Sequence, residues 1–147
     1  MTIDHGIELS TEHVVRWIEA YFAAWRVRDG DGVARLFTPD GVYQSIPGVA
    51  AETYVGREAI SDYIVNITGP QNEMSGLHGT PVVTGNRAAI ELWMRFRVKD
   101  AYPEGDDWMT LIEANFLTFA PDGLCSHNIE YWNWRKGWID PPEGWGS

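Results

Sequence analysis

Every second residue from position 88 to position 98 is apolar, and this alternation constrains the fold more than any other feature of the chain. The apolar positions are Ala88, Ile90, Leu92, Met94, Phe96 and Val98. The positions between them carry mainly charged side chains, with Trp93 as the large exception. A period of two is typical of a β-strand, because successive side chains point to opposite faces. The segment therefore predicts a long strand at residues 88–99 with one face on a core.

Two further segments predict long strands that follow in sequence, at 108–119 and 124–136. The polar stretch "DAYPEGDD" precedes the first and the turn sequence "APDG" separates the two. Gly85-Asn86 is a hairpin turn signal just before the alternating segment. Consecutive strands joined by short turns favour an antiparallel sheet, which we expect to begin near residue 73.

The first half of the chain has helical periodicity instead. A first helix, with Ser10 or Thr11 as its N-cap, places five large apolar side chains on one face. They are Val14, Ile18, Tyr21, Phe22 and Trp25. The stretch "RDGDG" ends this helix, and Asp31 is the expected cap of a short second helix that Pro39 stops. A short strand, "GVYQSI", precedes a third helix that begins near Gly56 and ends at "GPQN".

Helices followed by long strands predict an α+β class. We expect one domain over residues 1–147, with a core from 10 to 136 and an irregular tail from 137 onward. A strongly bent sheet around the helices would enclose a pocket, the usual setting for a small-molecule site.

Composition excludes several function classes. The formal net charge of −10 argues against nucleic acid and against anionic membranes. No phosphate-binding glycine loop, zinc-ligand spacing or nucleophile elbow is found, so we expect no metal and no cofactor. Cys125 is the single cysteine, and no signal peptide or membrane span is evident. These features predict a cytoplasmic protein.

Three quoted segments carry a family resemblance. "AYFAAWRVRDGDGVARLFTPDGVYQSIP", then "YVGREAISDYI", then the two long C-terminal strands, resemble the nuclear transport factor 2-like superfamily, including its SnoaL-like branch. The resemblance covers roughly residues 10–136. It implies a cone-shaped fold in which three N-terminal helices pack on a strongly curved antiparallel sheet and enclose a pocket. It also implies a homodimer, for which Trp93 and Tyr131 on the outer sheet face are candidate contacts.

The resemblance assigns strand faces to the pocket. The pocket-facing residues are then Met109, Leu111, Glu113, Asn115 and Leu117 on one strand, Asn128, Glu130, Trp132 and Trp134 on the next, and Leu92 and Met94 on the alternating strand. Trp25, Trp132 and Trp134 are expected either to stack on a ligand or to fill the core.

Ketosteroid isomerases use a general base with an oxyanion hole of a tyrosine and a protonated aspartic acid. The tyrosine corresponds to Tyr21, and the acid's position falls on Asn115, whose amide can also donate to an oxyanion. The position of the base falls on Ser45, which cannot by itself abstract a proton from carbon. The resemblance thus implies an oxyanion site without the usual base.

Limonene epoxide hydrolases use two carboxylates, an arginine and a water-holding tyrosine and asparagine. "VYQSIP" is similar to the water-holding segment, with Tyr43 as the tyrosine and Ser45 in place of the asparagine. The arginine and one acid fall on Leu92 and Met94, and the other acid falls on Glu130. Half of that machinery is absent.

Scytalone dehydratases use two histidines. His78 loosely matches one of them, and the second position falls near Trp93 or Met94.

Glu130 and Glu113 are the remaining acids predicted to face the pocket. Burial among leucine, methionine and tryptophan raises the pKa of a glutamate, which suits a general acid or base. The alternative is that either one is a salt-bridged or exposed strand residue. Tyr21 and Asn115 are likewise either functional or buried structural groups, and Tyr43, Ser45 and Asn128 are either pocket-lining or core.

These residues predict a cofactor-independent enzyme that uses general acid/base catalysis on a hydrophobic, oxygenated, ring-containing small molecule. Glu130 is the expected proton carrier, assisted by Glu113 or His78, while Tyr21 and Asn115 stabilise the developing negative charge. Isomerisation, dehydration and cyclisation all fit. The alternatives are a binding protein without catalysis and water addition of the epoxide hydrolase type.

Overall fold

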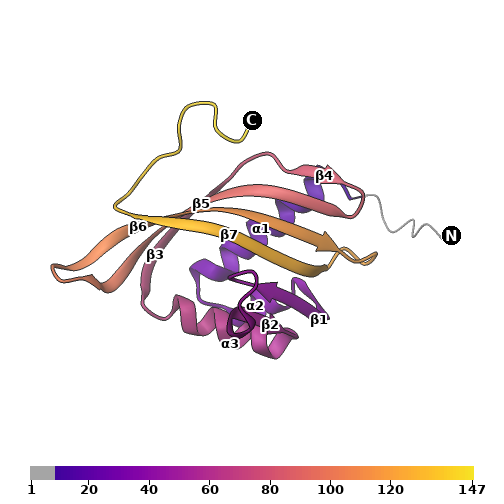
Figure 1. The fold of residues 1–147 in the computed structure, drawn as a ribbon, viewed down its shortest axis with the longest axis horizontal. Helices are drawn as coiled ribbons and strands as arrows, with labels where there is room; N and C mark the ends of the chain where they lie inside the picture. The colour runs from indigo at the N-terminus through magenta and orange to yellow at the C-terminus, as the bar shows by residue number, and fades with distance from the viewer. Residues whose placement is uncertain (1–8) are drawn as a thin grey trace.

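A computed structural model describes residues 9–147 as three α-helices and a seven-stranded sheet (Figure 1). The helices are α1 (Thr11–Arg26), α2 (Gly30–Ala34) and α3 (Arg57–Thr68), with a 3-10 turn, η1, at Ala50–Glu52. The strands are β1 (Phe37–Gln44), β2 (Thr53–Val55), β3 (Gln71–His78), β4 (Val82–Thr84), β5 (Arg87–Tyr102), β6 (Gly105–Phe119) and β7 (Cys125–Lys136). None of the helices described is long and apolar enough to cross a membrane.

The predicted helices are confirmed, but the second has a different cap and ends earlier than predicted. It stops at Ala34, so Pro39 lies in β1 and does not end the helix. Ser10 caps α1, because its hydroxyl accepts a hydrogen bond from the backbone N–H of His13 at 3.1 Å. The cap of α2 is Asp29 rather than Asp31, since the helix begins one residue before Asp31 and Asp29 accepts from the Gly32 N–H at 2.8 Å. Gly56, at φ 88°, begins α3 as expected.

The sheet is mixed, which corrects the expectation of a purely antiparallel sheet. Its strand order is β2-β1-β7-β6-β5-β3, with β4 paired to β5 beyond this path. β1 runs parallel to β7, and every other pairing is antiparallel. The parallel pair joins segments far apart in sequence, so no turn between them could have indicated it. The sheet has free edges at β2 and β3 and does not close.

The long hairpins confirm the strand predictions and extend them. Gly85-Asn86 forms the predicted turn, with Thr84 opposite Arg87. β5 and β6 continue into the predicted polar loop as far as the pair Tyr102 and Gly105. β1 begins at Phe37, earlier than predicted, and has an irregularity between Phe37 and Val42.

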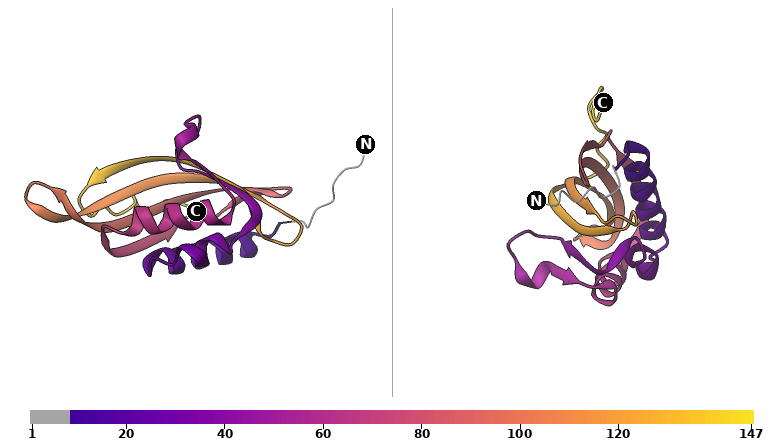
Figure 2. Two further views of the ribbon diagram at one scale, coloured as in Figure 1. Left: turned by 90° about the horizontal axis from the view of Figure 1, so that it is seen from below. Right: turned by 90° about the vertical axis from the view of Figure 1, so that its right-hand side faces the viewer.

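The helices lie on one face of the sheet (Figure 2). The alternating segment provides much of the core there, since Ile90, Leu92, Met94 and Phe96 are all at most 3% exposed. The side chains of α1 pack against this face, and at one point a glycine of the sheet allows a close approach. A Cβ atom on Gly76 of β3 would lie 3.0 Å from the ring of Phe22.

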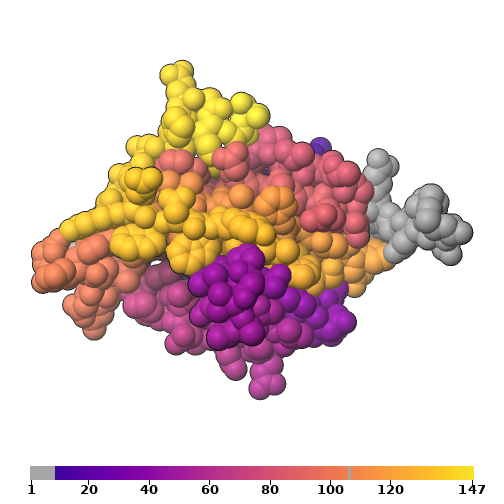
Figure 3. Space-filling view, in the orientation of Figure 1, coloured from indigo at the N-terminus to yellow at the C-terminus, as the bar shows by residue number. Residues whose placement is uncertain are grey.

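The C-terminal tail, residues 137–147, packs on the opposite face of β5 (Figure 3). The Trp145 ring meets Trp93 edge-on at 5.9 Å, and its indole N–H donates to Glu91 at 2.6 Å. The Trp138 ring lies 4.2 Å from the guanidinium of Arg95. Trp93, predicted as a dimer contact, is therefore covered by the chain itself. Tyr131 is 55% exposed, and the homodimer stays a prediction.

Replacing Trp145 with alanine should lower the free energy of unfolding by about 1–3 kcal/mol, because it removes a ring contact and a hydrogen bond at once. Trp145→Phe keeps a ring against Trp93 and should lose less. Urea unfolding followed by far-ultraviolet circular dichroism measures both. Equal stability of the alanine variant and the unmodified protein would show that the tail does not anchor this face.

Candidate active site

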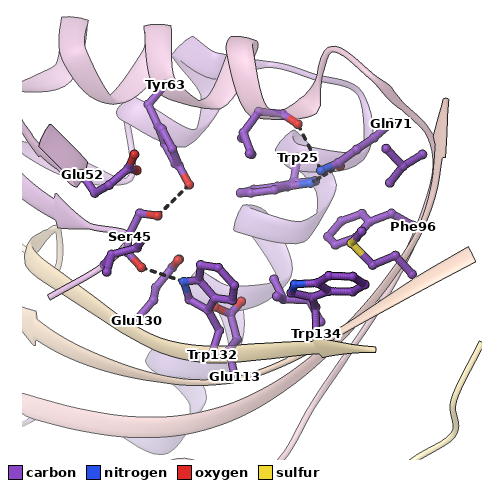
Figure 4. A pocket seen from close by; sticks show the side chains of 15 residues that line it. Trp25, Ser45, Glu52, Tyr63, Gln71, Phe96, Glu113, Glu130, Trp132 and Trp134 are labelled. Atoms are coloured by element: carbon purple, nitrogen blue, oxygen red, sulfur yellow. Dashed lines mark hydrogen bonds between the residues drawn. The ribbon is translucent and has the colours of Figure 1, made fainter. Parts of the chain in front are cut away.

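A cavity of about 300 Å³ lies between the inner face of the sheet and the helices (Figure 4). Its walls come from α1, α3, four strands and the segment that follows β1. The lining residues are Trp25, Ser45, Ile46, Glu52, Tyr63, Ile67, Gln71, Phe96, Val98, Met109, Leu111, Glu113, Glu130, Trp132 and Trp134. The wall is thus largely aromatic and aliphatic, with few polar groups, as is usual for small-molecule sites.

Hydrogen bonds fix two of the tryptophans in this wall. The Trp25 indole N–H donates to the side-chain oxygen of Gln71 at 2.7 Å. The Trp132 indole N–H donates to the backbone carbonyl of Ser45 at 2.8 Å, which ties β7 to the segment after β1. The Ser45 hydroxyl in turn accepts from Tyr63 at 3.1 Å. The aromatic surfaces are therefore held in place before any ligand enters.

Glu130 lies at the inner end of the cavity, 5% exposed, on β7. One of its carboxylate oxygens, Oε1, is the acceptor for two converging hydrogen-bond chains. In the first, Tyr21 lies 2.7 Å from the Tyr43 oxygen, and Tyr43 donates to Oε1 at 2.5 Å. Because the Tyr43 proton is engaged with the carboxylate, Tyr21 is the donor in the first link.

The second chain consists of two buried amides. Asn115 donates to the side-chain oxygen of Asn128 at 3.0 Å, and Asn128 donates to Glu130 Oε1 at 3.4 Å. The sheet register explains this convergence, since Asn115 pairs directly with Glu130 across β6 and β7. Side chains of paired residues share one face, which places the amides beside the carboxylate.

Burial raises the pKa of Glu130 to about 7, because desolvation disfavours the charged form. Hydrogen bonds from Tyr43, Asn128, Asn115 and Tyr21 act in the opposite direction. They stabilise the carboxylate and keep the pKa of Glu130 within the range in which a group can act as a general base. Burial also raises the pKa of Tyr21 and Tyr43 well above the usual value, so both phenols stay protonated and remain donors.

Glu113 is the second buried carboxyl group, 4% exposed, on β6. Burial raises its pKa well above the ordinary value, and the nearby Glu130 raises it further. Its Oε2 has no hydrogen-bond partner among the described residues. Glu113 therefore lacks the donors that favour ionisation of Glu130. Of the two acids, Glu130 gives up its proton first and Glu113 retains it.

The structure places the predicted binding residues in two groups. Trp25, Ser45, Trp132 and Trp134 line the cavity. The other four do not: Tyr43 and Asn128 lie behind Glu130 and bind it, and Leu92 and Met94 are 0% exposed within the core.

Among the predicted catalytic residues, only the two glutamates line the cavity. Tyr21 and Asn115 bind Tyr43 and Asn128, and Tyr21 also donates directly to Glu130 Oε1 at 3.5 Å. Both therefore support Glu130, and neither lines the cavity. His78 lies outside the cavity, at the end of β3. Its ring contacts the Gly79 carbonyl at 2.9 Å and lies 3.9 Å from Glu19.

Sequence reasoning missed two polar lining residues, Glu52 and Gln71. Glu52 ends the three-residue turn η1 and Gln71 is the first residue of β3, so neither the helical nor the strand period assigns them a face. Tyr63 of α3 also lines the cavity and was not among the predicted site residues. The described residues contain no group of three or more His, Cys, Asp or Glu side chains that could hold a metal ion.

The SnoaL-like domain family matches residues 18–128. The chain belongs to the SnoaL-like domain family. No curated protein matches the sequence at a significant level.

Solved structures share the fold at low sequence identity. One is SalBIII, described as an epoxide hydrolase/cyclase-like enzyme in pyran ring formation in polyether salinomycin. It is 17% identical with a TM-score of 0.68, and the match covers 83% of this chain and 92% of that one. A ketosteroid isomerase-like protein from Catenulispora acidiphila, in complex with trimethylamine, is 20% identical with a TM-score of 0.63, covering 78% and 83%. An epoxide hydrolase from M. tuberculosis, of the limonene epoxide hydrolase-like type, is 14% identical with a TM-score of 0.63, covering 83% and 84%.

These likenesses establish a SnoaL-like, ketosteroid isomerase-like fold for this chain.

Replacing Glu130 with glutamine should stabilise the protein at pH 8. The pKa of Glu130 is about 7 in the folded state, against a usual 4.5, so ionisation favours the unfolded chain as pH rises between these values. The full free-energy cost of ionising Glu130 in the folded state at pH 8 is on the order of 3 kcal/mol, and glutamine avoids this cost because it does not ionise. The gain should shrink strongly at pH 5. Urea unfolding at both pH values tests this, with the exposed Glu58→Gln as a control that should show no such gain.

Tyr43→Phe should raise the pKa of Glu130, because it removes the strongest of the hydrogen bonds that stabilise the carboxylate. Carbon-13 NMR titration of the glutamate carboxyl groups measures the shift. Tyr54→Phe is the matched control, since that phenol donates to Glu52 and not to Glu130. A Glu130 pKa that is unchanged in Tyr43→Phe would contradict the role assigned to the tyrosine chain.

Proposed function

We propose that this protein is a cofactor-independent enzyme that moves a proton on a hydrophobic, ring-containing, oxygenated small molecule. Glu130 is the general base and Glu113 is the proton-bearing partner. One observation carries the proposal: two buried carboxyl groups face one apolar cavity, and only Glu130 is held by a network of donors. Pairs of acids whose environments separate their pKa values are typical of sites that divide acid and base roles.

The proposed first step breaks a C–H bond next to a carbonyl group of the substrate. The proton goes to the Glu130 carboxylate, and the electron pair moves to the carbonyl oxygen to give an enolate. Glu113 donates a hydrogen bond to that oxygen, which stabilises the charge as it develops. Return of the proton to another carbon gives an isomer, while loss of a β-hydroxyl group, protonated as it leaves, gives a dehydrated product.

Tyr21 and Asn115 take positioning roles in this scheme. Asn115 acts on Glu130 through Asn128, while Tyr21 acts both through Tyr43 and by its own hydrogen bond to Glu130. Neither residue lines the cavity. The phenol that lines the cavity is Tyr63, whose hydroxyl lies against Ser45. Tyr63 is therefore a better candidate than Tyr21 for a contact with a substrate oxygen.

Water addition of the epoxide hydrolase type has less support. The positions expected for its arginine and one of its acids are Leu92 and Met94, both fully buried in the core. None of the described residues that line the cavity is an arginine.

A mass-spectrometric reaction screen tests the proposal. The protein is incubated with polyketide intermediates, unsaturated keto-steroids and terpene epoxides, in ordinary water and in deuterium oxide. An unchanged mass with a new retention time, or uptake of deuterium at carbon, supports isomerisation or cyclisation. Loss of water supports dehydration, and gain of water supports the epoxide hydrolase alternative. Ligands that quench the tryptophans but emerge unaltered across the panel favour a binding protein.

Glu130→Gln should lower kcat by at least about a thousandfold while leaving substrate affinity within roughly tenfold, because glutamine keeps the shape but cannot accept the proton. Glu113→Gln should cost less, about tenfold to a hundredfold, since its amide still donates to the oxyanion. Steady-state kinetics of both variants, beside Glu58→Gln, gives the comparison. Turnover retained in Glu130→Gln would exclude it as the base.

A further inference from the structure

The charged side chains in the cavity all have one sign. Among the 15 lining residues, Glu52, Glu113 and Glu130 are acidic, and none is lysine, arginine or histidine. A carboxylate or phosphate ligand would meet repulsion and no counter-charge. A cation would meet an opposite charge in a desolvated setting, where electrostatic attraction is much stronger than in water.

The walls of the cavity offer aromatic rings to a ligand. Trp132 and Trp134 extend from β7 on one side, with Trp25 and Phe96 facing the same space (Figure 4). Trp132 and Trp134 are 41% and 49% exposed, so their rings are open to solvent and to an entering ligand. Positively charged nitrogen is attracted to the faces of such rings, tryptophan most strongly.

The deep end of the cavity offers an unused acceptor. Glu113 is 96% buried, since only 4% is exposed, and its Oε2 has no partner among the described residues. Burying such a group without a partner is unfavourable. A cationic group of a ligand would offset the negative charge of the carboxyl pair on one side, and the same cationic group would contact the aromatic rings on the other.

We propose that the cavity selects ligands that carry a positively charged nitrogen beside an apolar ring, and that the natural substrate is a cyclic amine of this kind. This inference rests on the proposed function in placing the substrate in this cavity, and it names the substrate class. A cation here also lowers the pKa of Glu130, which keeps the carboxylate ionised and able to accept a proton at neutral pH.

Three probes that share one ring separate charge from shape. They are (4-hydroxycyclohexyl)trimethylammonium, its neutral isostere 4-tert-butylcyclohexanol, and 4-hydroxycyclohexanecarboxylate. Isothermal titration calorimetry and quenching of tryptophan fluorescence measure their affinities. We expect the ammonium probe to bind at least about tenfold more tightly than the alcohol, since ring and carboxylate contacts both favour charge. We expect the carboxylate probe not to displace the ammonium probe from the cavity.

The pH dependence provides an independent readout, because the ammonium probe is permanently charged. The titratable groups that face Glu130 are Tyr21, Tyr43, Tyr63 and Glu113, from α1, β1, α3 and β6, with Glu52 lining the cavity from η1. Affinity for the ammonium probe should rise from pH 6 to pH 8 as Glu130 ionises, and affinity for the alcohol should not rise. Burial raises the pKa of all three phenols, so they contribute no titration in this range.

Variants locate the effect in the cavity. The double variant Glu113→Gln, Glu130→Gln should lose the preference for ammonium over alcohol, while Glu58→Gln, which removes the same type of charge from the exposed surface, should keep it. Equal affinities, tighter binding of either other probe, or no binding of the ammonium probe at millimolar concentration overturns the inference. Ammonium selectivity without turnover of any cyclic amine would overturn the enzyme proposal and the assignment of a cyclic amine as substrate, while the selectivity of the cavity for a cationic ligand would stand.

Discussion

The burial of the Glu130 carboxylate is the constraint on which the rest of the site depends. A charged group at 5% exposure is strongly disfavoured unless the protein replaces the water that it loses. Here two chains of donors, one of phenols and one of amides, converge on a single oxygen and replace part of that hydration. The compensation is incomplete, so the pKa rises to about 7 and the group can exchange a proton near neutral pH.

The fold supplies these donors from three separate places in the chain. Tyr21 comes from the first helix, Tyr43 from the strand that runs parallel to β7, and the amides from β6 and β7 themselves. Parallel pairing brings Tyr43 directly opposite Asn128, two residues from Glu130. A shift of one residue in that register would turn the phenol to the other face and leave the carboxylate without its strongest donor.

Buried acids and exposed aromatic rings line the same cavity, and each supports a different part of the proposed chemistry. In the proposed scheme the acids move the protons, while the rings and the single sign of charge select the ligand. The outer face of β5 is separate from this, because the tail covers it with Trp138 and Trp145. The tryptophans therefore occupy three kinds of position: some line the cavity, some lie in the core and some anchor the tail. Composition alone could not distinguish these positions.

The sequence by itself determined the helices, the long strands and the inward face of β5, because these follow from periodicity and local capping. It also identified both buried glutamates, since the family resemblance assigned faces to β6 and β7. It could not show that β1 lies parallel to β7, that Tyr21 and Asn115 bind Tyr43 and Asn128 behind Glu130, or that His78 lies elsewhere. It gave no sign of Glu52 or Gln71. Those features depend on contacts between distant segments, and only the tertiary structure decides which side chains share a desolvated space.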